Sequence, residues 1–498
     1  MQIKTRSLLP ILFAVAFGAL APQSSALAAK KRQASKPATL KKGAAVASAL
    51  PALAAETALA AHRFGVGAAP GELDALGDDA PALLYAQTFD RTAALARWPG
   101  LFGSSLDAMR QLIVLRDNRG SQPGVNVLGH FRRDARRALP QAIEQRMWQA
   151  VESTTPFLER LVWFWSNHFT VSGMKGRTMG MAAGHEREAI RPNINGSFRD
   201  LLHASTRHPG MLFYLDNHLS MGERSSAGVY SGRGLNENLA RELMELHTLG
   251  VDQGYNQDDV RNLAKMLTGW TFSRNGEPMP GQFYFRDTYH EPGSKTLMGR
   301  DYPDQGEAEA AQALDRLAHD PATARRVAFK LARHFIADEP PPALVAHLTK
   351  VFQDTGGDLK ALSHALIDHP ESWGQKLQKA KSHQEYVVGV ARLVGGALPV
   401  ATLLEVMENF GQAPFMAPSP AGWPEVSTAW IAPDSALRRA RFALAMAEQA
   451  ADRLDVAALI AETMDGFAPE TTLQALRDAA SPQEALALVF ASPTMQRR

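Results

Sequence analysis

Apolar residues recur every three or four positions along most of the chain from about residue 55 onward. This spacing places them on one face of a helix, so it predicts α-helices. The segment 156–169 is a clear example, because Pro156 suits a first helical turn and Leu161 and Trp165 follow at helical spacing. The same pattern predicts helices at 236–249, 326–335, 341–352 and 436–453. We therefore expect an all-α fold.

The segment 270–302 departs from this pattern. It contains short runs of aromatic and apolar residues, among them Phe283-Tyr284-Phe285, that are separated by clusters of glycine and proline. Such runs between turn-forming residues predict a small β-hairpin inserted into the helical body. Irregular insertions often carry binding residues, so we expect this segment to cover a site.

One sequence pattern occurs twice. Residues 196–209 and 357–370 share identical residues in register, which are Leu201 and Leu362, His203 and His364, His208 and His369, and Pro209 and Pro370. Upstream of each copy, a predicted helix ends in His-Phe, at 168–169 and at 334–335. These matches predict an internal duplication of a two-helix unit. Because duplicated helical pairs can pack around a pseudo-twofold axis, we expect a single helical domain over 55–498.

The first 54 residues differ in character from the rest. Basic residues precede an apolar run over residues 8–20, and Ala26-Leu27-Ala28 matches the small-x-small pattern of a cleavage site. These features predict a signal peptide over 1–28 and therefore export to the periplasm or beyond. The run of about 13 residues is short for a bilayer, so we expect no stable membrane span after cleavage. Residues 29–54 are predicted to be a basic flexible linker.

Composition excludes several kinds of chemistry. Cysteine is absent, which rules out c-type haem attachment, cysteine-ligated iron–sulfur clusters and thiol catalysis. The sequence also lacks a nucleotide-binding motif. Residues 1–42 carry only basic charges within a net charge of +2, so the remaining chain is mildly acidic. We therefore expect no nucleic-acid partner, because phosphate backbones attract clustered positive charge.

Several motifs together resemble one bacterial family, catalogued as domain of unknown function 1800. They are the segments 159–169, 189–192, 208–217, 236–251, 267–272, 330–335 and 422–424. The resemblance implies export and a helical fold. It also implies that the gene often lies beside one for a second secreted family, which resembles alkaline-phosphatase-like enzymes, so a co-exported phosphatase-like protein is the expected partner. The resemblance implies no reaction and assigns no catalytic residues.

The predicted helix over 236–249 carries a candidate metal site. Asn238, Glu242 and Glu245 share one face at positions i, i+4 and i+7. Carboxylates repeated on one helix face can bind a metal when another helix adds a ligand, for which His168 and His185 are candidates. Glu242, Glu245 and His168 are therefore the predicted ligands of a divalent transition metal. In the alternative interpretation, Arg241 forms i,i+4 ion pairs that only stabilise the helix.

Two other residues have alternative interpretations. His168 could act as an acid–base group in an apolar pocket, or it could be a hydrogen-bonded core residue. Arg191 could pair with Glu188 or bind an anion. The full set of candidate catalytic residues is His168, Arg191, Asn238, Arg241, Glu242, Glu245 and His247.

Two classes of function follow from these patterns, and no motif decides whether the protein is an enzyme. In the first, the chain is an exported envelope enzyme or metal-binding protein with a Glu/His/Arg site between helices. In the second, it is a non-enzymatic periplasmic binding or scaffold protein for the co-exported phosphatase-like partner.

Overall fold

The computed structural model describes residues 55–73, 79–89, 104–117, 127–374, 377–396, 400–464 and 468–498. The predicted signal peptide (1–28) and linker (29–54) lie outside these ranges. Within the described residues, helices dominate and the strands form two short antiparallel hairpins, which confirms the predicted all-α fold with a small β insertion. Among these residues, none of the helices combines the length and the apolar composition that a membrane crossing requires.

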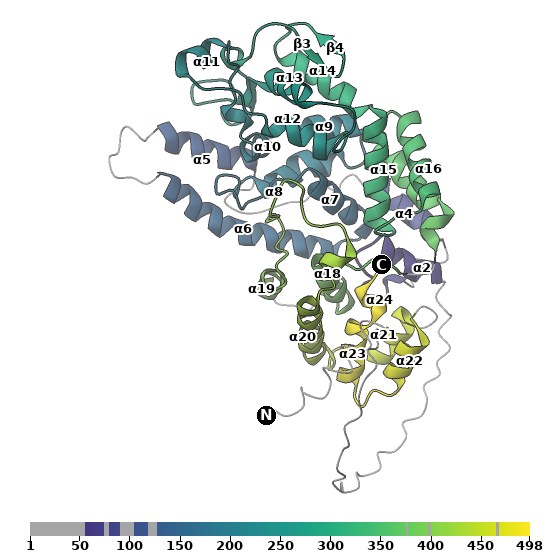
Figure 1. Ribbon diagram of the computed structural model, residues 1–498. Helices are drawn as coiled ribbons and strands as arrows, with labels where there is room; N and C mark the ends of the chain where they lie inside the picture. The colour runs from purple at the N-terminus through teal and green to yellow at the C-terminus, as the bar shows by residue number, and fades with distance from the viewer. Residues whose placement is uncertain are drawn as a thin grey trace, which may run out of the picture.

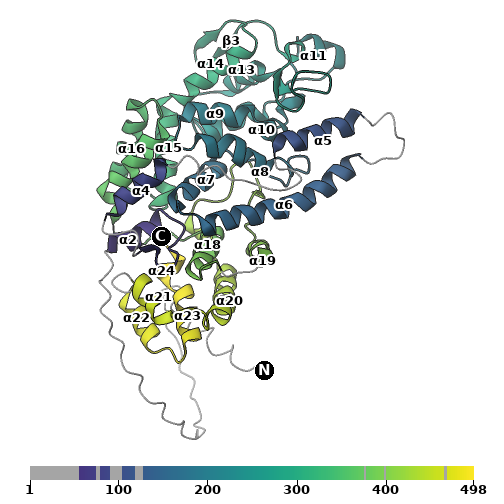
Figure 2. The ribbon, with the colours of Figure 1, turned by 180° about the vertical axis from the view of Figure 1, so that it is seen from behind.

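The N-terminal helices occupy the middle of the molecule (Figure 1). They are α2 (Ala55–Arg63), α4 (Ala80–Phe89), α5 (Ser105–Asp117), α6 (Val127–Glu152) and α7 (Pro156–His168). In both views α5 and α6 lie side by side as a long pair (Figures 1 and 2). Every residue of α7 from Pro156 to Trp165 is buried, and these include Glu159 and Arg160. Because charged groups in a core need partners, α7 is a helix on which a polar site can be built.

Short helices follow and lead to the end of the molecule that is uppermost in Figure 1. They are α8 (Ala182–His185), the π-helical turn η2 (Glu186–Ile190), the 3₁₀ turn η3 (Arg191–Asn193), α9 (Phe198–Arg207), α10 (Pro209–Tyr214), η4 (Asn217–Leu219), α11 (Ser226–Ser231), α12 (Asn238–Glu242), the π-helical turn η5 (Leu243–His247) and α13 (Gln257–Leu267).

The β insertion consists of two hairpins with a 3₁₀ turn, η6 (Asp287–Tyr289), between them. Strand β1 (Trp270–Phe272) pairs with β2 (Phe283–Phe285), and β3 (Lys295–Leu297) pairs with β4 (Arg300–Tyr302). Met298 and Gly299 connect β3 to β4 with positive φ angles of 47° and 73°. Two such residues make the type I′ turn that matches strand twist. The aromatic runs in the sequence are therefore strands, as predicted.

The second half of the chain is again helical. It continues with α14 (Glu307–Ala318), α15 (Pro321–Phe335), α16 (Pro342–Asp354), α17 (Leu359–Asp368) and η7 (Pro370–Trp373). It ends with α18 (His383–Leu393), α19 (Val400–Phe410), η8 (Ser427–Ala429), α20 (Pro433–Ala450), α21 (Val456–Thr463), α22 (Glu470–Arg477), α23 (Pro482–Ala491) and α24 (Pro493–Gln496). Helices α20 to α23 form the end opposite the hairpins (Figure 1).

The two sequence repeats meet in space at the starts of α9 and α17. The Phe198 amide donates to the Gly357 carbonyl at 2.8 Å, and the Leu359 amide donates to the Gly196 carbonyl at 2.9 Å. These reciprocal bonds join corresponding residues of the two copies, which is what a local pseudo-twofold requires. The internal duplication is therefore a structural one.

The duplicated His-Pro pairs end one helix and begin the next. His208 Nδ1 accepts the Gly210 amide at 3.0 Å, and His369 Nδ1 accepts the Glu371 amide at 3.3 Å. A histidine before proline takes an extended conformation and can cap the following turn, so both histidines have a structural role here.

The helix predicted over 236–249 is not one regular α-helix. After the short helix α12, the chain widens into the π-helical turn η5, and the Thr248 hydroxyl donates to the Leu243 carbonyl at 2.6 Å. A π-turn holds an extra residue, so it rotates the side chains after Leu243 relative to an α-helix. The face shared by the three predicted residues is altered at its C-terminal end.

The last described residues return to the centre of the molecule, where the C label lies beside α18 and α24 (Figure 1). The Arg498 amide donates to the Lys379 carbonyl at 2.9 Å, and the Lys379 amide donates to the Arg498 carbonyl at 3.2 Å. This two-residue pairing holds the Arg498 side chain among helices from the first half of the chain.

Candidate functional site

A buried network of four charged side chains joins α6, α7 and the turns η2 and η3. Arg191 donates to both carboxylate oxygens of Glu159, at 2.8 and 3.0 Å, and to Glu186 at 3.0 Å. Arg146 Nε donates to the second oxygen of Glu186 at 2.7 Å. Glu159, Glu186 and Arg191 are each only 1% exposed. Such a buried pair holds its geometry because separating the charges would leave one of them unpaired in the core.

The local backbone explains why these groups converge. Glu186 begins the π-helical turn η2, and Arg191 begins the 3₁₀ turn η3, with Pro192 as its second residue. Burial alone would raise the pKa of the Glu186 carboxyl, but the charges of Arg146 and Arg191 and the hydrogen bonds to Glu186 together lower it. The carboxylate is therefore ionised. Arg191 is bound by Glu159 and Glu186, whereas Glu188 forms its ion pairs with Arg187 and His208. Anion binding by Arg191, the other alternative, stays a prediction.

A cavity of about 100 Å³ lies beside this network. Its lining combines groups from distant parts of the chain, among them Arg146, Trp163, Ser166, His185, Glu186, His334, Gln384, Glu385, Phe415, Trp423, Glu425 and Arg498. Asn167 fixes one wall, because its amide nitrogen donates to the Trp423 carbonyl at 3.0 Å and its oxygen accepts the Trp423 amide at 2.7 Å. The cavity thus lies between α6, α7, α18 and the segment 412–425.

Several N–H groups of the lining have no protein acceptor. Trp163 Nε1, Gln384 Nε2 and Arg498 Nε are buried and make no hydrogen bond within the described part of the chain. Arg146 Nε donates to Glu186, and the Arg146 guanidinium carbon lies over the Trp163 and Phe415 rings, 5.5 and 5.2 Å from their centroids. The structure shows no hydrogen bond from its Nη atoms to any described residue. Four residues therefore offer unused donors to one cavity.

Positive charge also exceeds negative charge behind the Gln384 wall. Arg160 and Arg498 both contact the carboxylate of Glu385, the former at 3.0 Å. Lys381 has no carboxylate contact among the described residues and lies 3.1 Å from the ring nitrogen Nδ1 of His62. Burial, with the charges of Arg160, Arg498 and Arg439, lowers the pKa of Lys381 to about 7. This cluster would be stabilised by a negative charge nearby.

His334 is the histidine of the lining that stands beside this cluster. Arg160 Nη2 lies 3.3 Å from its Nε2, so Nε2 is the acceptor and Nδ1 carries the proton. Burial, together with the charge of Arg160, holds the pKa of His334 well below its usual value. The His334 ring is therefore neutral at pH 7, so it can form hydrogen bonds in the cavity but contributes no positive charge to it.

The predicted site residues are only partly brought together. His168 Nε2 lies 3.0 Å from the carbonyl oxygen of His247, and the two rings are 6.2 Å apart. Burial is the main reason that the pKa of His168 is well below its usual value and that of His247 is lowered to about 3. Both rings are packed against Phe169. This surrounding is that of neutral core histidines.

The helix 236–249 places its polar residues elsewhere. Arg241 pairs with Glu237 at 3.0 Å and with Glu245 at 3.3 Å, the ion pairs of the alternative interpretation. Asn238 is exposed. Glu242 is half-buried, and burial together with the charge of Glu245 raises the pKa of its carboxyl.

Glu242, Glu245 and His168 do not gather their donor atoms around one point. Among the described residues, the histidine and carboxylate group close enough for one ion is His290, Asp304 and Glu309, in the β insertion. A metal bound by Glu242, Glu245 and His168 stays a prediction that this geometry does not support. The sequence indicated segment 270–302 as a binding region but did not single out these residues.

The cavity donors were also missed in the sequence. Trp163 lies in a segment that resembles the family, but nothing in the pattern distinguished its N–H from that of a core tryptophan. Gln384 and Arg498 carry no signal in the sequence, because their role depends on which residues lie opposite them.

The comparisons with known proteins identify the family. Residues 59–497 match the family described as a protein of unknown function (DUF1800), so the chain belongs to it, as its motifs predicted. Comparison with curated proteins and with solved structures gave no significant match.

Proposed function

We propose that this member of the DUF1800 family is an exported protein that binds a small anionic ligand in the cavity between α6, α7 and α18. The observation that carries the proposal is the set of buried N–H donors without acceptors, Trp163 Nε1, Gln384 Nε2 and Arg498 Nε. Export follows from the signal peptide predicted over residues 1–28.

The energetic argument concerns unmade hydrogen bonds. A buried donor without a partner destabilises a protein by about 1–3 kcal/mol, so natural structures satisfy nearly all of them. Three such donors around one cavity could all be satisfied by a single ligand that supplies several acceptor atoms. Carboxylate, sulfate and phosphate groups do so, and arginine recognises each of them through charge-assisted hydrogen bonds.

The size of the cavity limits the ligand. A single buried water occupies about 10–15 Å³ of cavity volume, so a cavity of about 100 Å³ can hold a group of several non-hydrogen atoms. This is the size of an inorganic oxyanion or of the acidic end of a small metabolite. A nucleic-acid strand is too large, which agrees with the mildly acidic chain.

Binding is supported better than acid–base catalysis. The carboxylates of Glu186 and Glu385 each form ion pairs with arginines, and these ion pairs make them poor proton donors. Two histidines, His185 and His334, line the cavity and could exchange a proton. The Ser205 hydroxyl lies 2.9 Å from His185 Nε2, but Ser205 does not line the cavity, so this pair gives no nucleophile facing a bound ligand. A role as partner of a phosphatase-like protein stays a prediction from the family resemblance.

The test is calorimetric titration of the purified mature chain with phosphate, sulfate and succinate. We expect at least one of them to bind, and Trp163→Phe to weaken that binding roughly tenfold or more by removing one N–H from a charged acceptor. Trp148→Phe is the matched control, because Trp148 Nε1 is also buried without a partner but does not line the cavity. It should leave the affinity unchanged.

A second pair of variants tests the sign of the ligand charge. Gln384→Glu replaces a donor with a carboxylate and should abolish anion binding, whereas Gln449→Glu on the exposed side of α20 should not. The proposal fails if none of the three anions binds, or if both glutamine variants have the same effect.

A further inference from the structure

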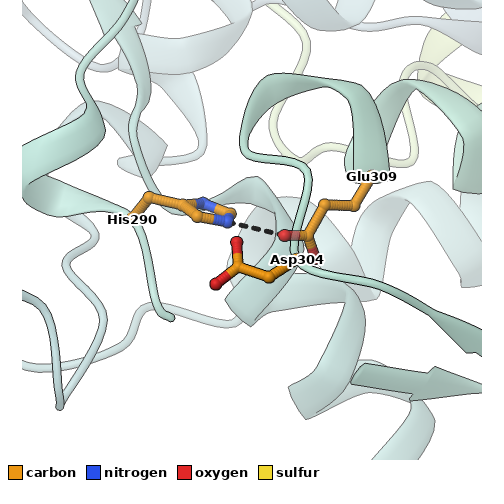
Figure 3. A group of neighbouring side chains, drawn as sticks. All are labelled: His290, Asp304 and Glu309. Atoms are coloured by element: carbon orange, nitrogen blue, oxygen red, sulfur yellow. Dashed lines mark hydrogen bonds and ion pairs between the residues drawn. The ribbon is translucent and has the colours of Figure 1, made fainter. Parts of the chain in front are cut away.

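A second group of polar side chains comes from the segments on either side of the β3–β4 hairpin, and none of them lines the cavity (Figure 3). His290 follows η6, Asp304 lies between β4 and α14, and Glu309 is in the first turn of α14. One donor atom from each of the three lies within 4.8 Å of the other two. Figure 3 shows the imidazole and both carboxylates facing a common point.

The two ring nitrogens of His290 have different partners. His290 Nδ1 lies 2.9 Å from the Thr268 carbonyl oxygen, so Nδ1 carries the proton and donates it there. In the neutral ring, Nε2 then has a lone pair and no proton. A backbone carbonyl that holds Nδ1–H in this way is the usual support of a metal-binding histidine.

That lone pair faces another one. His290 Nε2 lies 2.8 Å from Glu309 Oε1, which is also an acceptor when the carboxyl is ionised. Two acceptors at this distance repel each other unless a cation bridges them, and in this structure Lys295 Nζ does so, 3.2 Å from Nε2 and 2.9 Å from Oε1. Two ligands of one tetrahedral Zn²⁺ ion, each at about 2.0–2.2 Å, are about 3.3–3.6 Å apart, so the two atoms would need to separate by only about half an ångström to reach ligand spacing.

Glu309 gives an independent indication. Its side chain is 1% exposed, and its second oxygen Oε2 has no hydrogen-bond partner within the described residues. An unpartnered buried carboxylate oxygen points to a missing ligand. Asp304 is exposed and accepts the Gly293 amide through Oδ2 at 2.7 Å. Hydrogen bonds from the Gly293 and Gly306 amides and the charge of Lys295 hold the pKa of its carboxyl below the usual value, so it stands as a carboxylate on the side open to water.

Lys295 now occupies the point between these groups. Its buried ammonium lies 2.9 Å from Glu309 Oε1 and 3.2 Å from His290 Nε2, and it donates to the Glu291 carbonyl. The single positive charge of the ammonium can neutralise only one of the two carboxylates. A divalent ion would neutralise both and would also accept the histidine lone pair.

We propose that His290, Asp304 and Glu309 bind a divalent transition-metal ion such as Zn²⁺, which displaces the ammonium of Lys295. One imidazole and two carboxylates suit Zn²⁺ better than Ca²⁺ or Mg²⁺, which prefer oxygen ligands alone. Water completes the coordination on the Asp304 side. Without metal, Lys295 acts as the internal cation that keeps the site formed.

The test measures Zn²⁺ affinity of the metal-free full chain by competition with a fluorescent chelator. Lys295→Met removes the competing ammonium and keeps all three ligands, so it should tighten Zn²⁺ binding at least tenfold. Lys379→Met is the matched control, since Lys379 is another buried lysine that pairs with a carboxylate, Asp338, at 2.8 Å. It should leave the affinity for Zn²⁺ as in the parent chain.

Ligand variants decide the outcome. Glu309→Gln in the Lys295→Met background should abolish binding. Asp304→Asn, which changes an exposed residue, gives the same test if the buried variant does not fold. Unchanged Zn²⁺ affinity in Lys295→Met, or tight binding that survives both ligand variants, would overturn the proposal. Thermal unfolding supplies a second readout, because Zn²⁺ should raise the melting temperature of Lys295→Met and leave that of its Glu309→Gln derivative unchanged.

Discussion

At the scale of single residues, the core of this protein is unusual for the charges it contains. Glu159, Glu186 and Arg191 are almost completely buried, yet each has partners of opposite charge at hydrogen-bond distance. Such a network stabilises a particular geometry more than it stabilises folding in general, because desolvation offsets much of the attraction. Here the geometry it holds is one wall of the cavity.

Removing one charge from this network should therefore lower the stability of the fold strongly. Glu186→Gln leaves Arg146 and Arg191 without a shared carboxylate, and we expect it to lower the free energy of unfolding by about 3–5 kcal/mol. Glu245→Gln removes an ion pair with Arg241, whose side chain is 38% exposed, and should cost less than about 1 kcal/mol. Urea denaturation of both variants checks the prediction. Similar losses in the two would show that the buried network is not a special feature.

At the scale of elements, the site depends on irregular backbone. The π-helical turn η2 brings Glu186 and Arg191 together, and the Asn167 side chain holds the segment at Trp423 as a neighbouring strand would. This contact needs glycine at position 422, where φ is +81° and a Cβ atom would lie 2.5 Å from Asn167 Oδ1.

Two glycine variants separate the contact from the backbone strain. Gly422→Ala adds both a strained φ and a clash with Asn167, whereas Gly411→Ala adds the strained φ of +73° in open space. We expect Gly411→Ala to cost about 1–2 kcal/mol and Gly422→Ala to cost clearly more. Gly422→Ala should also weaken anion binding, because it displaces Trp423 from the cavity wall. Equal unfolding free energies for the two variants would contradict this account.

At the scale of the whole molecule, buried positive charges from several helices converge. Arg160 comes from α7, Arg439 from α20, Lys381 from the residues before α18 and Arg498 from the last described residues, with His62 of α2 beside Lys381. Glu385 is the carboxylate that contacts Arg160 and Arg498. The cluster forms only when these segments, which are far apart in the sequence, come together.

This cluster should make stability depend on pH. Burial lowers the pKa of Lys381 to about 7, against an ordinary value of 10.5, so between these values the unfolded chain binds more protons than the folded one. The free energy of unfolding should therefore rise with pH through that window. Lys381→Met should make the rise shallower, as measured by denaturation at pH 7, 8 and 9. A slope unchanged by the substitution would show that Lys381 is not the group responsible.

The helical class, the position of the β insertion, the repeated segments and the family could all be predicted from the sequence. Each of these depends on local patterns, such as the helical spacing over 156–169, the aromatic runs between glycines and the repeated His-Pro pairs, and local patterns are set by neighbours along the chain. The i,i+4 pairs of Arg241 could also be foreseen, since a helix fixes their distance.

The sites, in contrast, depend on contacts between residues that are far apart in the sequence. Gln384 and Arg498 become candidate binding residues because they line the same cavity as Trp163 and Arg146. His290 becomes one because it contacts Glu309 and Lys295. Hydrogen bonding and charge interactions act over a few ångströms in space, whatever the separation along the chain. A helical pattern shows which residues are buried, but it does not show which polar groups will meet, or which will be left without a partner for a ligand to bind.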